Sequence, residues 1–154
     1  MNEIKENEII FDFTLSSCEG GEVSSRNLPA KYNVIYFYPK DDTPGCTMEA
    51  KEFASLKSDF DAASAAVFGV SKDDKNSHIK FKNKYDLNFD LLTDESDVTE
   101  KFGIWVEKNM YGKKYMGIER STFLLDKSGK ILKIWKKVKP EGHAMEVLEY
   151  IKNI

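Results

Sequence analysis

The sequence predicts an α/β fold in which helices cover a mixed central sheet. Apolar strands at residues 33–38 and 65–70 are each followed by a helical pattern, which is typical of parallel strands joined by helical crossovers. Two later strands flank the turn at residues 126–129, which predicts an antiparallel hairpin. The chain closes with an amphipathic helix over residues 141–151.

The composition predicts one domain spanning residues 1–154. These 154 residues, 41% hydrophobic and 32% charged, are enough for one core. The net charge of −3 argues against a nucleic-acid partner or an anionic membrane surface. No apolar run approaches the roughly 18 residues of a membrane-spanning helix. The polar start shows no secretory signal, and the two cysteines then predict a reducing, cytoplasmic location.

The N-terminal part predicts a β-hairpin. Residues 9–15 alternate well enough for a strand, and Gly20-Gly21 marks a turn into a short partner strand around Val23. Cys18 stands on the connection between the two strands.

The central strand leads directly into the most informative loop. Residues 33–38 are rich in β-branched and aromatic side chains, and Pro39 ends the strand because proline cannot donate to the ladder. Thr43 suits the N-cap of a helix and Pro44 its first position. Cys46 then falls in the first helical turn, where the positive potential of the helix start favours a thiolate.

A helix start alone does not ionise a cysteine near neutral pH. It contributes only about 0.3–1 kcal/mol to a nearby negative charge, less than the roughly 1.36 kcal/mol of one pKa unit. A close guanidinium lowers the pKa of an acid by about 1–3 units and remains protonated. Of the two arginines, Arg26 and Arg120, the second opens a strand and is the predicted partner of Cys46. Glu49 would orient Arg120, although a glutamate also suits a helix start by itself.

The middle of the chain predicts two further helices and a strand. Residues 73–76 offer a helix start, with Ile79 and Tyr85 as candidate buried positions, and residues 89–92 form a short strand. A helix then runs through Phe102.

Residues 105–117 predict a loop or an extended arm. Three of its side chains would form a contact surface: Trp105, Tyr111 and Met116. His78 and His143 lie far apart in the sequence without ligand partners, and both are expected at the surface.

These residues carry a family resemblance. Pro39, Thr43 and Cys46 match the Pro-x-x-x-Thr-x-x-Cys motif of peroxiredoxins, and residues 120–123 resemble the arginine-bearing strand of that family. Residues 36–49 are similar to the bacterioferritin comigratory protein (peroxiredoxin Q) group, and the similarity covers nearly the whole chain. The resemblance implies a thioredoxin-like fold with an N-terminal β-hairpin extension.

The resemblance also implies a thiol-dependent peroxidase that reduces hydrogen peroxide and organic hydroperoxides. Cys46 would attack a peroxide oxygen and become a sulfenic acid. Thr43 would hold the peroxide, Arg120 would stabilise thiolate and transition state, and Pro39 would cover the sulfur. A thiol partner (thioredoxin, glutaredoxin or a small thiol) would then reduce the enzyme. This chemistry requires no metal, nucleotide, flavin or other cofactor.

One position departs from the family pattern. Many members of the group carry a second cysteine where this chain has Lys51. An external thiol is the default reductant of the sulfenic acid, and Cys18 is the internal candidate. Cys18 would need to approach Cys46 to about 5.5–6 Å between Cα atoms, through local unfolding. The resemblance implies a monomer or a weak homodimer.

Two other functions fit the same fold. A thiol–disulfide oxidoreductase is weakened because the Cys-x-x-Cys pair is absent, Thr43 standing three residues before Cys46. A non-catalytic binding or holdase module needs only an ordinary Cys46 thiol. Each site residue also has a purely structural explanation: Thr43 as an N-cap, Pro39 as a strand terminator and Arg120 as an ion-pair residue.

Overall fold

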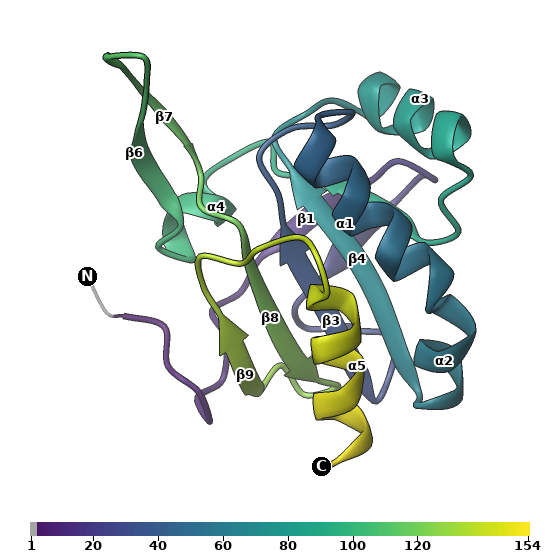
Figure 1. Cartoon of the computed structure of the whole chain (residues 1–154). Coiled ribbons are helices and arrows are strands. Elements are labelled where there is room, and N and C mark those ends of the chain that lie inside the picture. Colours follow the sequence, from purple (N-terminus) through teal and green to yellow (C-terminus); the bar gives the residue numbers. More distant parts are fainter. Residues whose placement is uncertain (1–2) are drawn as a thin grey trace.

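The centre of the molecule is a mixed sheet, which confirms the predicted fold class. The computed structural model describes residues 3–154, and its seven-stranded sheet has the order β2-β1-β5-β4-β3-β8-β9 (Figure 1). Strands β3 (Tyr32–Phe37), β4 (Ala65–Ser71) and β5 (Asp90–Thr93) run parallel, and β8 (Ser121–Asp126) lies antiparallel to β3. The end of β3 therefore lies beside the start of β8.

The edges of the sheet contain the two predicted hairpins. Strands β1 (Thr14–Ser17) and β2 (Glu22–Ser24) form the N-terminal hairpin, and β9 (Ile131–Trp135) pairs with β8. The first strand is shorter than predicted. Residues 7–10 instead make backbone hydrogen bonds to residues 129 and 131 beside β9, because the segment crosses from that edge of the sheet to β1.

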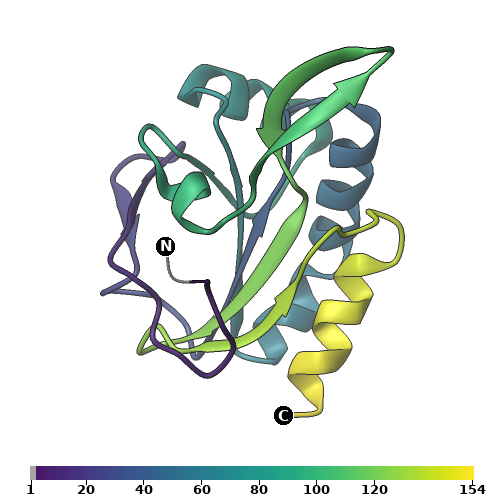
Figure 2. The same ribbon diagram turned by 90° about the vertical axis from the view of Figure 1, so that its left-hand side faces the viewer.

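Helices cover both faces of the sheet. Helices α1 (Pro44–Ser55), α2 (Lys57–Ala62) and α5 (His143–Lys152) lie on one face (Figure 1), and α3 (Lys75–Tyr85) contributes to the same core. The short helix α4 (Val98–Lys101) and the N-terminal segment lie on the other face, as Figure 2 shows from the side.

Strand β3 is buried on both faces, which explains its continuous apolar sequence. Val34, Tyr36 and Tyr38 point into the core beneath α1 and α5, whereas Ile35 and Phe37 point into the core on the α4 side. All five side chains are at most 1% exposed. This alternation fixes the register of the strand whose end carries the reactive loop.

Both histidines predicted at the surface are buried. His78 is 0% exposed, with Nδ1 2.7 Å from Asp41 Oδ2 and Nε2 3.1 Å from the Leu92 carbonyl oxygen. His143 is 3% exposed, with Nε2 2.7 Å from Thr122 Oγ1. The prediction was wrong because these partners come from distant segments, which no local pattern reveals. Ile79, predicted as a buried position, is instead exposed.

Residues 105–117 form an arm, as predicted, but the arm is a β-hairpin. Strands β6 (Trp105–Met110) and β7 (Lys113–Ile118) form a separate two-stranded sheet that projects from the body (Figures 1 and 2). Tyr111 and Gly112 turn the chain with φ angles of 53° and 81°, the geometry of a tight hairpin turn. Tyr111 is fully exposed at the tip.

Candidate active site

The loop after β3 and the start of α1 present Cys46 at one edge of the sheet. Thr43 is the N-cap and Pro44 the first helical residue, so Cys46 is the third. The first helical hydrogen bond runs from the Thr47 amide to the Thr43 carbonyl oxygen at 2.8 Å. The amides of Gly45 and Cys46 precede it and have no acceptor within the helix, so they are available to an anion. Cys46 itself is only 2% exposed.

The Arg120 side chain connects the sulfur to a buried carboxylate. Its Nη2 lies 3.5 Å from Cys46 Sγ, and its Nη1 donates to Glu49 Oε1 at 2.7 Å. The sheet explains the contact: Phe37 at the end of β3 is paired with Ser121, the residue after Arg120. Residues 74 positions apart therefore meet at one edge of the sheet.

Gly45 allows the guanidinium to come this close. A Cβ atom at this position would lie 3.2 Å from Arg120 Nη2 and 3.4 Å from Pro140 Cγ. The first contact is tighter than a Cβ atom usually makes, so a larger residue would require the Arg120 side chain to shift by a few tenths of an ångström. Sequence reasoning missed this role, although a glycine directly before the cysteine was its signal.

Glu49 is fully buried, and its environment favours a bound proton. Burial raises the pKa of its carboxyl group to about 7, against the opposing effect of Arg120. Its Oε2 atom and the Tyr36 hydroxyl have no hydrogen-bond partner among the described residues. Burial, with the nearby Glu49 and Cys46, also raises the pKa of Tyr36 well above its usual value. The phenol is therefore neutral, whereas Glu49 changes charge near neutral pH.

Thr43 and Pro39 lie on the loop that precedes the helix. Thr43 makes no side-chain capping bond; its hydroxyl donates to the Lys40 carbonyl oxygen at 2.8 Å. The hydroxyl oxygen therefore keeps its lone pairs for an incoming O–H group. Pro39 is half-buried directly after Tyr38 and presents no backbone donor.

A buried polar network supports the other side of this loop. Asp41 Oδ1 accepts from the Tyr38 hydroxyl at 2.5 Å, and Asp41 Oδ2 lies 2.7 Å from His78 Nδ1 and 2.8 Å from Ser77 Oγ. The Asp41 amide also donates to Asp73 Oδ2 at 2.8 Å. The contacts with Ser77 and His78 hold the loop against α3. Sequence reasoning missed them because Asp41 gives no sign that it is buried.

Cys18 has a different environment and is not beside the candidate site. It is 6% exposed, and its thiol donates to Asp90 Oδ1 at 3.5 Å. Burial raises the pKa of the Cys18 thiol, and the Asp90 charge acts in the same direction. Both cysteines are free thiols. Lys51 lies exposed on α1, with its Nζ 5.9 Å from the centre of the Tyr85 ring.

Comparison with known proteins identifies the family. Residues 7–134 match the AhpC/TSA family. The chain is 50% identical to a putative peroxiredoxin Bcp of Coxiella burnetii, over 88% of this chain and 91% of the other. It is 46% identical to peroxiredoxin Bcp of Bacillus subtilis, over 93% and 92% of the two chains. The chain belongs to the peroxiredoxins of the AhpC/TSA family.

Solved structures agree with this assignment. The bacterioferritin comigratory protein of Xanthomonas campestris superposes with a TM-score of 0.82 at 42% identity, covering 92% of this chain and 90% of the other. A Cys-to-Ser mutant of Xylella fastidiosa PrxQ gives a TM-score of 0.89 at 34% identity, covering 99% and 98%. This peroxiredoxin is therefore a thiol-dependent peroxidase with a thioredoxin-like fold.

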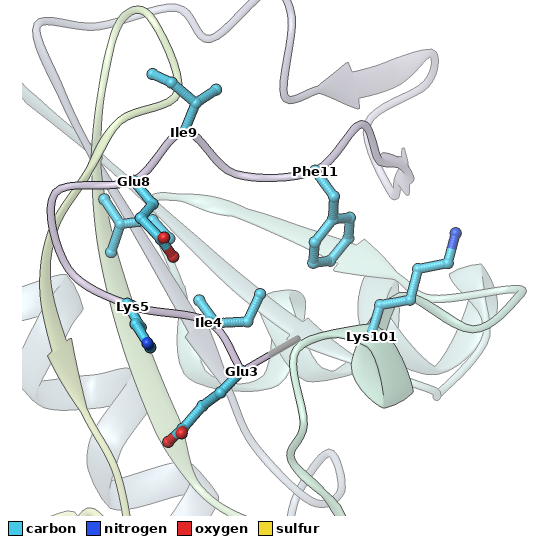
Figure 3. A pocket seen from close by; sticks show the side chains of 8 residues that line it. Glu3, Ile4, Lys5, Glu8, Ile9, Phe11 and Lys101 are labelled. Atoms are coloured by element: carbon cyan, nitrogen blue, oxygen red, sulfur yellow. The ribbon is translucent and has the colours of Figure 1, made fainter. Parts of the chain in front are cut away.

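Other surface features lie apart from Cys46. A hollow of about 790 Å³ lies between the N-terminal segment, α4 and β9, and its lining includes Ile4, Phe11, Lys101 and Ile131. Figure 3 shows this hollow from close by. None of the residues proposed for catalysis lines it. Within residues 3–154 no group of three His, Cys, Asp or Glu side chains could hold a metal ion. None of the helices in that range is long and apolar enough to cross a membrane.

Proposed function

We propose that Cys46 is the thiol that reduces the peroxide and that Arg120 is its cationic partner. The observation that supports this proposal is the 3.5 Å separation of Arg120 Nη2 and Cys46 Sγ at the start of α1. The guanidinium and the helix start both favour a negative charge on the sulfur. The same groups stabilise charge that develops on the peroxide during the reaction.

In the first step the thiolate attacks the terminal oxygen of the hydroperoxide. A sulfur–oxygen bond forms while the oxygen–oxygen bond breaks, so that Cys46 is oxidised to a sulfenic acid and the peroxide is reduced. The leaving alkoxide or hydroxide takes a proton from solvent and departs as an alcohol or water. The Arg120 guanidinium and the free amides of Gly45 and Cys46 act as donors to the reacting oxygens.

Thr43 and Pro39 have supporting roles in this proposal. The Thr43 hydroxyl donates to the Lys40 carbonyl, so it accepts a hydrogen bond from the peroxide O–H and orients it toward the sulfur. Pro39 covers the sulfur without offering a donor that would compete for the peroxide. Glu49 holds the guanidinium through the 2.7 Å bond to Nη1, leaving Nη2 for the sulfur.

The proposed substrates are hydrogen peroxide and organic hydroperoxides. The structure of the Xanthomonas campestris relative is described in terms of its alkyl peroxide reduction activity. Because Cys46 is only 2% exposed, the terminal oxygen must reach the sulfur while the organic group stays at the rim.

In the second step an external thiol reduces the sulfenic acid. The thiol condenses with Cys46–SOH to a mixed disulfide and water, and a second thiol then releases the Cys46 thiol and carries the disulfide away. Thioredoxin, glutaredoxin or a small thiol supplies these equivalents. Cys18 is a poorer nucleophile because burial and Asp90 raise its pKa. We place the reaction in the cytoplasm, where free thiols persist, and in a monomer or weak homodimer.

The test is the second-order rate of Cys46 oxidation by hydrogen peroxide and by tert-butyl hydroperoxide. We expect a rate far above that of free cysteine, followed by a single mixed disulfide when a thiol is added. Peptide mass analysis then locates the link. A Cys18–Cys46 disulfide would contradict the external-thiol step, and a rate equal to that of free cysteine would contradict the role of Cys46.

A further inference from the structure

The β6–β7 arm begins beside the candidate site. Ile118, the last residue of β7, is two positions before Arg120, and the Glu119 amide donates to the Ile104 carbonyl oxygen at 2.7 Å. The base of the arm is thus fixed to the segment that carries the guanidinium. Figure 2 shows the arm rising from the same end of the molecule as the start of α1.

The side chain of Lys108, on β6, points toward the base of the arm. Lys108 is paired across the hairpin with Tyr115. Its side chain, however, lies over Gly117, because a Cβ atom there would be 3.2 Å from Lys108 Cδ and 3.4 Å from Lys108 Cε. Gly117 is two residues nearer to Arg120 than Tyr115 is. Because Gly117 has no side chain, the Lys108 side chain can extend across it toward the base of the arm.

The electrostatic surroundings agree with this direction. Lys108 is half-buried, whereas its neighbours Glu107 and Asn109 are exposed. Burial lowers the pKa of Lys108, and the Arg120 guanidinium lowers it further, while Cys46 and Glu119 act in the opposite direction. The ammonium group is thus within electrostatic range of the sulfur.

Lys108 forms no ion pair with a carboxylate of the described residues, although Glu119 acts on it at longer range. Among the ion pairs of residues 3–154, none includes Lys108. Arg120, by contrast, is paired with Glu49. When the Glu49 carboxyl is ionised it balances Arg120, whereas Lys108 keeps a positive charge that no ion pair of residues 3–154 offsets. Such a charge acts on any reactant that must approach Cys46 from solvent.

We propose that Lys108 is a selectivity residue of this site, held in place by Gly117, and that it favours reactants carrying a carboxylate close to the atom that meets Cys46. The favoured reactant is a carboxylate-bearing hydroperoxide in the oxidising step or a carboxylate-bearing thiol in the reducing step. The proposal rests on the proposed role of Cys46 as the reacting thiol. Lys108 acts on the approach of the reactant, so Arg120 and Thr43 keep their roles.

Alkylation by iodoacetate and iodoacetamide tests the proposal without any peroxide. In both reactions the Cys46 thiolate forms a sulfur–carbon bond and iodide leaves, but only iodoacetate is anionic. Rates at Cys46, followed by peptide mass at fixed pH, give the iodoacetate-to-iodoacetamide ratio. We expect Lys108→Met to lower this ratio about three- to tenfold, the effect of removing one partly screened charge near the sulfur. Lys108→Arg should preserve it.

A matched control is available on the same hairpin. Lys114→Met removes the same charge from an exposed position of β7 and should leave the ratio within about twofold of the original protein. Gly117→Val keeps every charge but fills the space under the Lys108 side chain, and should lower the ratio part of the way. Equal ratios in the Lys108→Met and Lys114→Met variants, whether lowered or unchanged, would overturn the proposal.

Two further comparisons identify the step that uses the lysine. Monoperoxysuccinate against peracetic acid, two peroxy acids that differ in the added carboxylate, tests the oxidising step. The pair 3-mercaptopropionate and 2-mercaptoethanol tests the reduction of the sulfenic acid. Lys108→Met should lower the anionic-to-neutral ratio in at least one pair, and no change in either would contradict the proposal. Failure of the proposed peroxidase role gives a different result: slow peroxide reactions in every variant, with the alkylation ratio still sensitive to Lys108.

Discussion

The two cysteines form a natural comparison, because both are nearly buried and belong to the same apolar core. Cys46 Sγ lies 3.5 Å from the guanidinium of Arg120, at the start of a helix. Cys18 Sγ lies 3.5 Å from a carboxylate oxygen of Asp90, in a turn after a strand. The distance is the same and the sign of the neighbour is opposite. The proposed assignment of Cys46 as the reacting thiol therefore rests on the charge beside the sulfur, more than on its burial.

Replacing each cysteine by serine in turn tests this comparison, and the Cys46 variant has the largest expected effect. Cys46→Ser should reduce peroxide turnover by more than about 1,000-fold, because the atom that forms the new bond is removed. Cys18→Ser should leave turnover with an added thiol within about twofold, since Cys18 lies beside a carboxylate and remains a thiol. Stopped-flow measurement of peroxide consumption checks both. Comparable losses in the two variants would show that Cys18 takes part in the cycle.

Removing the Arg120 guanidinium tests whether the positive charge beside Cys46 accounts for the reactivity proposed for it. Arg120→Met should lower the rate of Cys46 oxidation by about 100- to 1,000-fold, the usual loss when one preorganised donor is removed from a reacting centre. Arg120→Lys should recover part of this rate, because a lysine keeps the charge but not two separately directed donors.

Two measurements control the arginine experiment. Arg26→Lys changes the other arginine, which pairs with Asp12 at the surface, and should not affect the rate. The alkylation rate of Cys18 in the Arg120 variants should stay constant because its charged neighbours are Asp90 and Lys82. A faster reaction at Cys18 would indicate general unfolding rather than loss of a specific contact, because unfolding exposes this buried thiol.

The parts of the fold that follow from local chemistry were predictable. Local signals mark these boundaries strongly: Pro39 after the strand, and Thr43 and Pro44 at the helix start. The end of β3 therefore falls within one residue of the prediction, and α1 starts where predicted. The turn between β8 and β9 is equally local. The proximity of Arg120 to Cys46 is not local; it was inferred from the charge that a thiolate needs and from the family resemblance.

The parts that were missed depend on distant partners. Burial of His78 depends on Asp41 and on the Leu92 carbonyl, which lie 37 and 14 residues away in the chain. The strands of the β6–β7 arm carry no alternating apolar face, because the arm pairs with itself and packs little against the body. The direction of Lys108 depends on a glycine across the hairpin, which only the register of the pairing reveals.

Glu49 extends the comparison from reactivity to stability. Its pKa rises from 4.5 to about 7 in the folded protein because the carboxyl is buried. The folded state therefore holds this proton more tightly than the unfolded chain does. The contribution of Glu49 to the free energy of unfolding should fall as pH rises from about 4.5 to about 7, by about 3 kcal/mol in total. It should then stay constant at higher pH.

Urea unfolding at several pH values measures this contribution. The difference in unfolding free energy between the original protein and Glu49→Gln should become less favourable to the original protein across that range, because glutamine does not titrate. Glu107→Gln, a change on the exposed face of the arm, provides the matched control and should give a flat difference. A difference that grows with pH would mean that the Arg120 pair overcomes burial and keeps Glu49 ionised.

The smallest expected effect comes from crowding the cation without removing it. Gly45→Ala places a Cβ atom about 3.2 Å from Arg120 Nη2, so the guanidinium must move by a few tenths of an ångström away from the sulfur. We expect Cys46 oxidation to slow by about threefold to tenfold, since a small misplacement weakens an oriented charge–dipole contact without abolishing it. Combining Gly45→Ala with Arg120→Met should add almost nothing to the loss caused by Arg120→Met alone, because the two changes act through the same group. Additive losses in that double mutant would show that Gly45 acts independently of Arg120, and the space left by the glycine would then not be what brings the guanidinium to Cys46.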